Sequence, residues 1–258
     1  RKEFHALSQE FKDRPDVMRF LRGGQWRGFF SKYSESNLLQ KKMLRASLRV
    51  QKLLQGRLSR DAKAKLMQAR EHVLRAQCND AFWHGVFGGL YAPHLRTELW
   101  RDLVRAETLA DEVAFPRKSN VRIERTDFDA DGADEFVVSS PRMSALVRPA
   151  AGGTIEALDF RPSAMTLINS LQRRPEAYHD RLRDAGHSQA GTVASIHDNV
   201  RSREKGLERF LQYDRWPRNA FRLLVFASSK SHEDYAAVRL DENADLAGGD
   251  YAVRAVGA

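Results

Sequence analysis

Apolar residues recur at intervals of three and four along the first half of the chain, which is the spacing of one buried helix face. The first stripe begins after Ser36 and contains Leu39, Met43, Ala46, Val50, Leu53 and Leu54. The second follows Ser59, a residue type favoured at helix N-caps. It contains Leu66, Met67, Val73 and Leu74. The third begins at Pro93, which suits a first helical turn, and contains Leu95, Leu99, Leu103, Val104 and Val113. Because amphipathic helices bury their stripes against one another, the pattern predicts a small helical bundle.

The spacing changes from about Asn120 onward, where apolar and polar residues alternate over short runs. These runs cover residues 121–125, 136–138, 145–147 and 155–160, and a further strand-like run covers 221–226. Turn residues separate the first four, as in an antiparallel sandwich or barrel. The sequence therefore predicts an α-then-β chain with its boundary near Phe115–Pro116. We expect a helical domain over residues 1–115 and a β-domain over residues 116–258.

Composition limits the class of protein. The chain has 258 residues, 42% of them hydrophobic, which is enough for a sizeable core. No stretch is as long and apolar as a membrane span, so a membrane is not an expected partner. Cys78 is the single cysteine, which excludes an internal disulfide and predicts a reducing, cytoplasmic setting. Because the first residue is Arg1 and not Met, we expect a processed chain or a piece of a longer one.

The net charge of +9 raises nucleic acid as a partner. The basic residues are, however, interleaved with acidic ones, as in RSREKGLER at residues 201–209. No basic run is accompanied by aromatic platforms, and no zinc-finger or RNA-binding signature occurs. Nucleic acid is therefore not the expected partner.

The stretch 77–96 combines features that a plain structural helix does not need. Its chemistry-bearing members are Asn79, Asp80, Trp83 and His84, and a glycine break follows at Gly88–Gly89. An amide, a carboxylate and an imidazole beside an aromatic plate are typical of a site that binds a polyhydroxylated ligand.

A second candidate site lies between two predicted strands, in the acidic run DFDADGADE at residues 127–135. Its carboxylates are Asp127, Asp129, Asp131 and Glu135, which can converge on Ca²⁺, a cation with six to eight oxygen ligands. A full EF-hand would need flanking helices and an acid at position twelve, where this chain has Val138. The alternative is a solvated Asx-type hairpin turn. We expect no required cofactor, and the run leaves two interpretations open, a structural Ca²⁺ site and an Asx-type turn.

Two later segments, 173–179 and 196–198, gather His, Asp and Glu residues. Such residues can be catalytic, but no Ser or Cys nucleophile accompanies them in a known arrangement. Polar residues that hold the sheet in place are the favoured interpretation.

The stretch QCNDAFWHGVFGGLYAPHLR is similar to the central-domain signature of glycoside hydrolase family 57, in its α-amylase/4-α-glucanotransferase branch. Upstream, GGQWRGFFSKYSESNLLQKKML resembles the helix that precedes that signature. Downstream, GGTIEALDF, SLQRRPEAYHDRL and SIHDNVRSREKGLERFLQYD resemble its C-terminal β-domain, so the likeness runs from about Gly23 to Phe226. It implies an N-terminal distorted barrel, a helical bundle and a mutarotase-like β-sandwich. Only the last two are represented here, the sandwich in truncated form.

The resemblance also implies an activity, a retaining double displacement on α-1,4-glucan or maltooligosaccharide. Its glutamate nucleophile and aspartate acid/base would lie on the missing barrel, the chain's expected partner, and the chain alone would be inactive. Asp80 would accept hydrogen bonds from sugar hydroxyls and Trp83 would stack on a glucose ring. His84 and Asn79 would contact or support the substrate. A non-catalytic carbohydrate-binding module is the alternative, and a homodimer is left open.

Three positions depart from the family pattern. Phe82 stands where a Tyr is frequent, Gln40 where a His is usual, and Ser34 where a Pro is usual. These departures bear on the preferred substrate.

Overall fold

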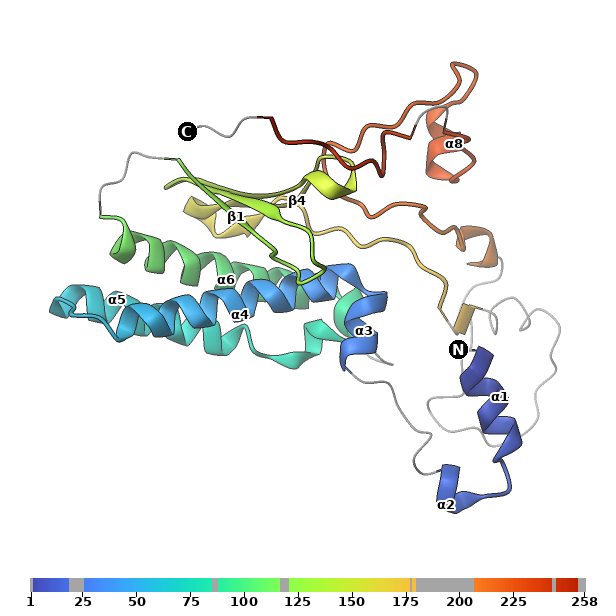
Figure 1. Ribbon diagram of the computed structural model, residues 1–258, viewed down its shortest axis with the longest axis horizontal. Helices are drawn as coiled ribbons and strands as arrows, with labels where there is room; N and C mark the ends of the chain where they lie inside the picture. The colour runs from blue at the N-terminus through green and yellow to red at the C-terminus, as the bar shows by residue number, and fades with distance from the viewer. Residues whose placement is uncertain are drawn as a thin grey trace.

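The computed structural model describes residues 2–18, 26–84, 88–116, 121–176, 178–179, 207–242 and 245–254. Its helices are α1 (Lys2–Glu10), α2 (Pro15–Met18), α3 (Trp26–Lys32), α4 (Ser34–Leu54), α5 (Arg60–Arg75), α6 (Pro93–Ala114) and α8 (His232–Ala236). Figure 1 shows α4, α5 and α6 packed side by side, with the sheet lying over them. None of the described helices is long and apolar enough to cross a membrane.

Helices α5 and α6 begin where the sequence predicts, and α4 begins at Ser34, two residues before the predicted Ser36. The Ser59 side chain accepts a hydrogen bond of 3.2 Å from the backbone N–H of Ala62 and so caps α5. Pro93 occupies the first turn of α6. Helix α6 packs against both α4 and α5. The buried apolar residues of this layer include Leu39, Val50, Leu66, Val73, Leu99 and Leu103.

One of the predicted stripes is too broad. On α5, Leu66, Ala69 and Val73 are buried. Met67 and Leu74 are 45% and 53% exposed, so their assignment to the buried face is wrong. Each follows a buried residue by one position, which in a helix of 3.6 residues per turn rotates it about 100° away from the core.

The strands form a single antiparallel meander in the order β1-β2-β3-β4-β5. Their bounds are β1 (Arg122–Thr126), β2 (Glu135–Ser139), β3 (Met143–Arg148), β4 (Thr154–Phe160) and β5 (Met165–Thr166). The first four coincide closely with the predicted runs, and β5 was not predicted. A register shift between Leu146 and Val147 interrupts the pairing of β3 with β4.

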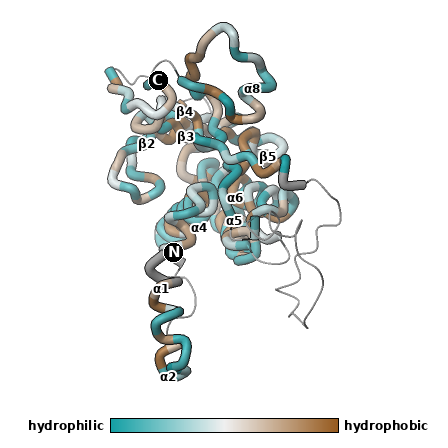
Figure 2. The backbone as a smooth tube through the Cα atoms, turned by 90° about the vertical axis from the view of Figure 1, so that its right-hand side faces the viewer, coloured by the Kyte–Doolittle hydropathy of each residue, from teal (hydrophilic) through white to brown (hydrophobic). Residues whose placement is uncertain are grey.

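The predicted order of helices followed by antiparallel strands is confirmed. The described residues contain one open sheet, where a sandwich has two, and the helical layer covers one face of this sheet. Leu146 of β3 and Ala157 of β4 belong to the same buried cluster as the helix residues, and Val137 packs against it. Figure 2 shows α4, α5 and α6 roughly end-on, with most of the sheet above them. The boundary at 115/116 stays a prediction.

The predicted strand at residues 221–226 is wrong. In this segment Phe226 forms only an isolated bridge with Glu242, and the neighbouring Ala220 forms one with Ile155. Phe221 has a φ of 62° and is 77% exposed, so its backbone leaves the extended conformation that a strand requires. Alternating apolar residues do not compensate for that kink.

Buried ion pairs join the helical layer to the sheet. Lys42 of α4 donates to Glu107 of α6 at 2.6 Å and to Asp159 of β4 at 3.0 Å. Asp159 is 1% exposed. Removing one member of such a group leaves an uncompensated buried charge, which costs roughly 3–5 kcal/mol. The lysine therefore fixes the position of the sheet on the helices.

Candidate functional site

The stretch 77–96 contains two short 3-10 turns ahead of α6, and its last four residues, 93–96, begin that helix. The turns are η1 (Asn79–Phe82) and η2 (Gly89–Tyr91). The Ser36 hydroxyl donates to the carbonyl of Phe82, which ties η1 to the start of α4. The backbone N–H of Leu90 donates to the carbonyl of Trp83 at 2.7 Å, which closes the loop on itself.

Gly89 makes this closure possible. Its φ is +49°, and a Cβ at this position would lie 2.1 Å from the carbonyl oxygen of Trp83. Any other residue would therefore collide with the backbone it packs against. The absence of a side chain at Gly89 thus allows the Trp83 backbone to lie against η2.

The four predicted substrate contacts lie along this loop. Asn79 and Asp80 are exposed, the Trp83 side chain is 43% exposed, and His84 is half-buried. Cys78, also exposed, donates from Sγ to the Asp80 carboxylate at 3.7 Å. An exposed indole beside a carboxylate and an amide offers both a stacking surface and hydrogen-bond acceptors.

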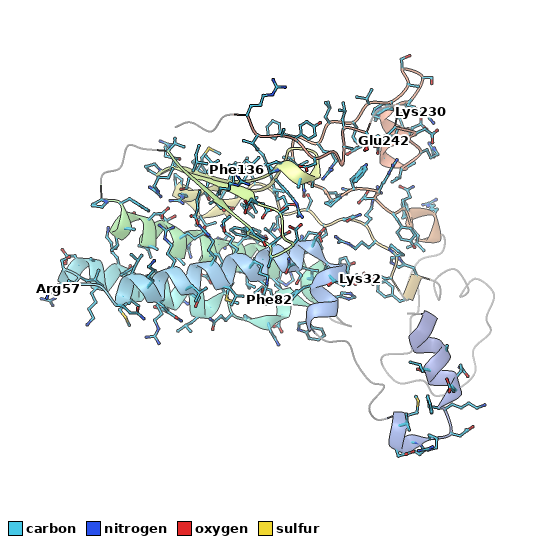
Figure 3. All side chains as sticks on the ribbon, viewed as in Figure 1. Lys32, Arg57, Phe82, Phe136, Lys230 and Glu242 are labelled. Atoms are coloured by element: carbon cyan, nitrogen blue, oxygen red, sulfur yellow. The ribbon has the colours of Figure 1, made fainter. Side chains whose placement is uncertain are left out.

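A buried carboxylate, Glu176, lies behind the loop. Its Oε1 accepts from the Tyr33 hydroxyl at 2.5 Å and from the Tyr91 hydroxyl at 2.6 Å, and its Oε2 accepts from Lys32 Nζ at 2.6 Å. His84 Nε2 lies 2.6 Å from the Tyr33 hydroxyl. Figure 3 labels Lys32 and Phe82 toward the end of the helical layer that lies away from Arg57.

The surroundings shift the pKa values of this cluster. Burial raises the pKa of Glu176, but the hydrogen bonds from Lys32, Tyr33 and Tyr91 outweigh it, so the pKa lies below its ordinary value. Burial lowers the pKa of His84, with a further decrease from Lys32 and opposition from Glu176. Burial and the Glu176 charge raise the pKa values of both tyrosines. The carboxylate is therefore charged and the imidazole neutral near pH 7.

Sequence reasoning placed Glu176 in a polar loop but did not connect it to His84. The two residues are far apart along the chain, and the tyrosine that joins them lies in the segment 23–44, whose family resemblance assigned it no role. The polar run at 173–179 and the family resemblance of the segment around it indicate a polar loop but do not specify the contacts of Glu176. The second polar segment, 196–198, lies outside the described residues.

The acidic run forms the hairpin between β1 and β2. Oxygens of Asp127, Asp129 and Glu135 lie within 4.8 Å of one another, a spacing that can hold a metal ion. Asp131, the fourth predicted ligand, instead accepts from Arg148, which also donates to Asp129 at 2.8 Å. The structure thus brings three of the four carboxylates together.

Both interpretations of the hairpin have features in their favour. Asp127 accepts from the backbone N–H groups of Asp131 and Gly132, each at 3.1 Å, as in an Asx-type turn. In contrast, Asp129 Oδ1 and Glu135 Oε1 are buried without a hydrogen-bond partner among the described residues. Burial raises the pKa of Glu135 to about 7. Buried oxygens without a hydrogen bond are costly unless a cation or water satisfies them, and Arg148 Nε, 3.8 Å from Glu135 Oε1, supplies part of that positive charge.

Two family models match the chain. The model described as alpha-amylase/4-alpha-glucanotransferase, middle domain, matches residues 24–110. The one described as alpha-amylase/4-alpha-glucanotransferase, C-terminal, matches residues 127–257.

Similar proteins carry the same two names. Alpha-amylase 1 of Dictyoglomus thermophilum is 41% identical over 83% of this chain and 29% of its own length. The 4-alpha-glucanotransferase of Thermococcus kodakarensis is 35% identical over 90% of this chain and 32% of its own length. The crystal structure of the Thermococcus litoralis 4-alpha-glucanotransferase superposes with a TM-score of 0.73 at 28% identity, over 99% of this chain and 34% of that one. The chain thus spans about a third of the length of these relatives.

Proposed function

The chain belongs to the alpha-amylase/4-alpha-glucanotransferase family, and we propose that it forms the middle and C-terminal part of an enzyme acting on α-glucans. The names of the relatives support this assignment, since they are α-amylases and 4-α-glucanotransferases. The substrate class would be α-1,4-glucan or maltooligosaccharide, and the reaction either hydrolysis or transfer to an acceptor sugar.

In this proposal the chain binds substrate and another part of the enzyme breaks the bond. The glutamate nucleophile and aspartate acid/base would lie on the N-terminal barrel that the family resemblance implies, and would carry out a retaining double displacement. Asp80 would accept hydrogen bonds from sugar hydroxyls, Trp83 would stack on the apolar face of a glucose ring, and Asn79 and His84 would contribute further contacts.

The observation that carries the proposal is the exposed indole on a constrained loop. The Trp83 side chain is 43% exposed, although the backbone around it is held in place. The Trp83 carbonyl accepts a hydrogen bond from the backbone N–H of Leu90, and the Phe82 carbonyl accepts one from the Ser36 hydroxyl. Leaving a large apolar ring in water forgoes about 25 cal/mol per Å² of buried area. An exposed ring on a segment whose carbonyls are hydrogen-bonded is suited to a ligand with an apolar face.

The test is to measure the binding of maltoheptaose to this chain by calorimetry and by NMR chemical-shift changes. We expect weak binding, with a Kd on the order of 1 mM, because the barrel side of the cleft would be supplied by another part of the enzyme. Trp83→Ala should weaken binding about tenfold. Tyr235→Ala, which removes an exposed ring on α8, is the matched control and should leave binding unchanged. Loss of binding in the control, or none in Trp83→Ala, contradicts the proposed contact.

Activity provides a second test. Incubation of the chain with maltoheptaose should leave the distribution of sugar lengths unchanged, and measurable transfer or hydrolysis would overturn the division of roles. The exposed Trp83 is also compatible with a non-catalytic carbohydrate-binding module. That alternative predicts a Kd on the order of 1 µM in the chain by itself, abolished by Trp83→Ala.

We also propose that the β1–β2 hairpin binds Ca²⁺ as a structural ion. Support comes from the converging oxygens of Asp127, Asp129 and Glu135 and from the two buried oxygens among them that lack a hydrogen bond within the described part of the chain. Carboxylate oxygens are hard ligands of the kind that Ca²⁺ prefers. Asp131, at the next position of the same alternating run, would complete the set by exchanging its Arg148 contact for the ion.

A further inference from the structure

The Tyr33 hydroxyl carries one proton but lies within hydrogen-bonding distance of two groups. This hydroxyl lies 2.5 Å from Glu176 Oε1 and 2.6 Å from His84 Nε2. Both distances are those of hydrogen bonds, yet one phenol hydrogen can serve only one of them. The assignment of that proton decides which nitrogen of His84 carries its own.

Glu176 determines the direction of the first bond. As a carboxylate it can only accept, and Tyr91 and Lys32 already donate to it at 2.6 Å each. The hydrogen bonds that lower its pKa keep it charged. If Tyr33 directed its proton elsewhere, two lone pairs would face each other at 2.5 Å in a buried site. Tyr33 therefore donates to Glu176.

The second bond then has only one possible direction. The Tyr33 oxygen, having given its proton to Glu176, must accept from His84, so Nε2 carries the hydrogen. Because burial lowers the pKa of His84, the ring is neutral near pH 7 and holds one proton only. Nδ1 is then a lone-pair acceptor.

We propose that Glu176 is a positioning residue that acts through Tyr33 to fix His84 in the Nε2–H tautomer, leaving Nδ1 to accept a hydrogen bond from a ligand hydroxyl. The hydrogen on Nε2 follows from the geometry, and the neutral state of the ring follows from its burial. That the hydroxyl belongs to a glucan rests on the proposed function. Among the described residues, no hydrogen bond to Nδ1 competes for this role.

Glu176 also fixes the orientation of the imidazole ring. His84 packs edge-on against Tyr33, with ring centroids 5.2 Å apart, and against Tyr91 at 5.0 Å. Both of these rings are held by their hydroxyls on the same Glu176 oxygen. One carboxylate from the segment after β5 thus orients the imidazole and selects its tautomer.

The direct test is nitrogen-15 NMR of the imidazole groups in this chain near pH 7.5. The proposal expects a pyridine-like Nδ1 and a pyrrole-like Nε2 for His84. Tyr33→Phe removes the acceptor for Nε2–H and should move the ring to a mixture of tautomers, and Glu176→Gln should do so in part. Tyr178→Phe is the matched control, because it removes a nearby hydroxyl that, in the described part of the chain, makes no hydrogen bond to Glu176. It should leave the spectrum unchanged.

The wild-type spectrum suffices to decide the question if the variants unfold. An Nδ1–H tautomer, or a charged ring, would overturn the proposal without any substitution. Maltoheptaose binding separates this inference from the proposed function. Tyr33→Phe should weaken binding about five- to tenfold, the loss of one hydrogen bond, while Tyr178→Phe binds normally. An Nε2–H tautomer without any sugar binding would refute the proposed function and retain the positioning role. Normal sugar binding with an Nδ1–H tautomer would refute the positioning role of Glu176 and retain the proposed function.

Discussion

Asp214 joins the segment after β5 to the C-terminal part of the chain. Its carboxylate accepts from the backbone N–H of Arg173 at 2.7 Å, from Arg173 Nη2 at 2.6 Å and from Arg218 Nε at 2.8 Å. Burial opposes its ionisation, but the bonds from Arg218 and Arg173 outweigh it and lower the pKa to about 2. This residue therefore contributes stability that depends on pH.

The pKa of Asp214 is lower in the folded state than in the unfolded chain, so its contribution is fully present above about pH 4 and is lost as the pH falls toward 2. Asp214→Asn should lower the free energy of unfolding at pH 7 by on the order of 2 kcal/mol and have little effect near pH 2. Urea unfolding at pH 7, 4, 3 and 2 measures this difference. Asp241→Asn, at a carboxylate that is 97% exposed, is the control. An equal loss at pH 7 and pH 2 would contradict the prediction.

The residue types of the candidate site were predictable, but its supporting contacts were not. Asn79, Asp80, Trp83 and His84 stand out because a structural helix does not need them together. Glu176 does not stand out, since a single acid in a polar loop has no periodic pattern. Only the folded chain shows that it is buried and that two tyrosines donate to it.

Among the elements, the β1–β2 hairpin gives a prediction about metal removal. Ca²⁺ at about 100 times its Kd should stabilise the chain by about 2.7 kcal/mol, since it binds only the folded hairpin. That corresponds to a rise in Tm of roughly 5–10 °C for a chain of this size, reversed by a chelator.

Asp129→Asn should abolish most of this rise, because it removes a charged ligand from the centre of the cluster. Asp134→Asn is the matched control, since Asp134 lies in the same hairpin but pairs with Arg125 at 2.7 Å. A Tm that does not respond to Ca²⁺ in the wild type would leave the Asx-type turn as the correct interpretation.

The first residue of η2, Gly89, gives a prediction about steric contact with the backbone. Gly89→Ala places a methyl group 2.1 Å from the Trp83 carbonyl and should displace this segment, with a loss of roughly 2–4 kcal/mol in stability and weaker sugar binding. Gly88 provides a matched comparison, because its φ is also positive but a Cβ there meets nothing closer than 3.7 Å. Gly88→Ala should cost only about 1 kcal/mol. Thermal unfolding and tryptophan fluorescence of both variants check this. Equal destabilisation by the two variants would show that the positive φ, and not the close contact with the Trp83 carbonyl, dominates the cost of Gly89→Ala.

Sequence periodicity located the long helices and the first four strands because each buries a regular face. The periodicity gave wrong or missing strands where the local backbone conformation, and not the burial of a regular face, determines the structure. Phe221, with its positive φ, interrupts an apparently regular strand pattern, and β5 is two residues long and too short for a periodic signal. Single-sequence patterns also give no information on partner faces, so a face that packs on helices looks the same as one that packs on a second sheet.

For the whole molecule, the shared core of helices and sheet predicts one cooperative unfolding transition. Leu146 and Ala157 lie in the same buried cluster as the helix residues, and Lys42 pairs across the two layers. Neither layer can unfold without exposing that surface. Helix content from far-UV circular dichroism and strand content from infrared spectroscopy should therefore share one midpoint in urea. Two separate midpoints would instead indicate that residues 1–115 and 116–258 fold independently.

The bonds of Glu176 have a consequence for how the chain reaches its folded state. Its contacts with Lys32 and Tyr33 span 144 and 143 positions in the sequence. Contacts of such long range require closure of a large loop and tend to form late. During synthesis from the N-terminus, α3, α4 and the loop carrying His84 would emerge well before the carboxylate that organises them. The proton arrangement of His84 would thus be set among the last events of folding, after the helices have assembled.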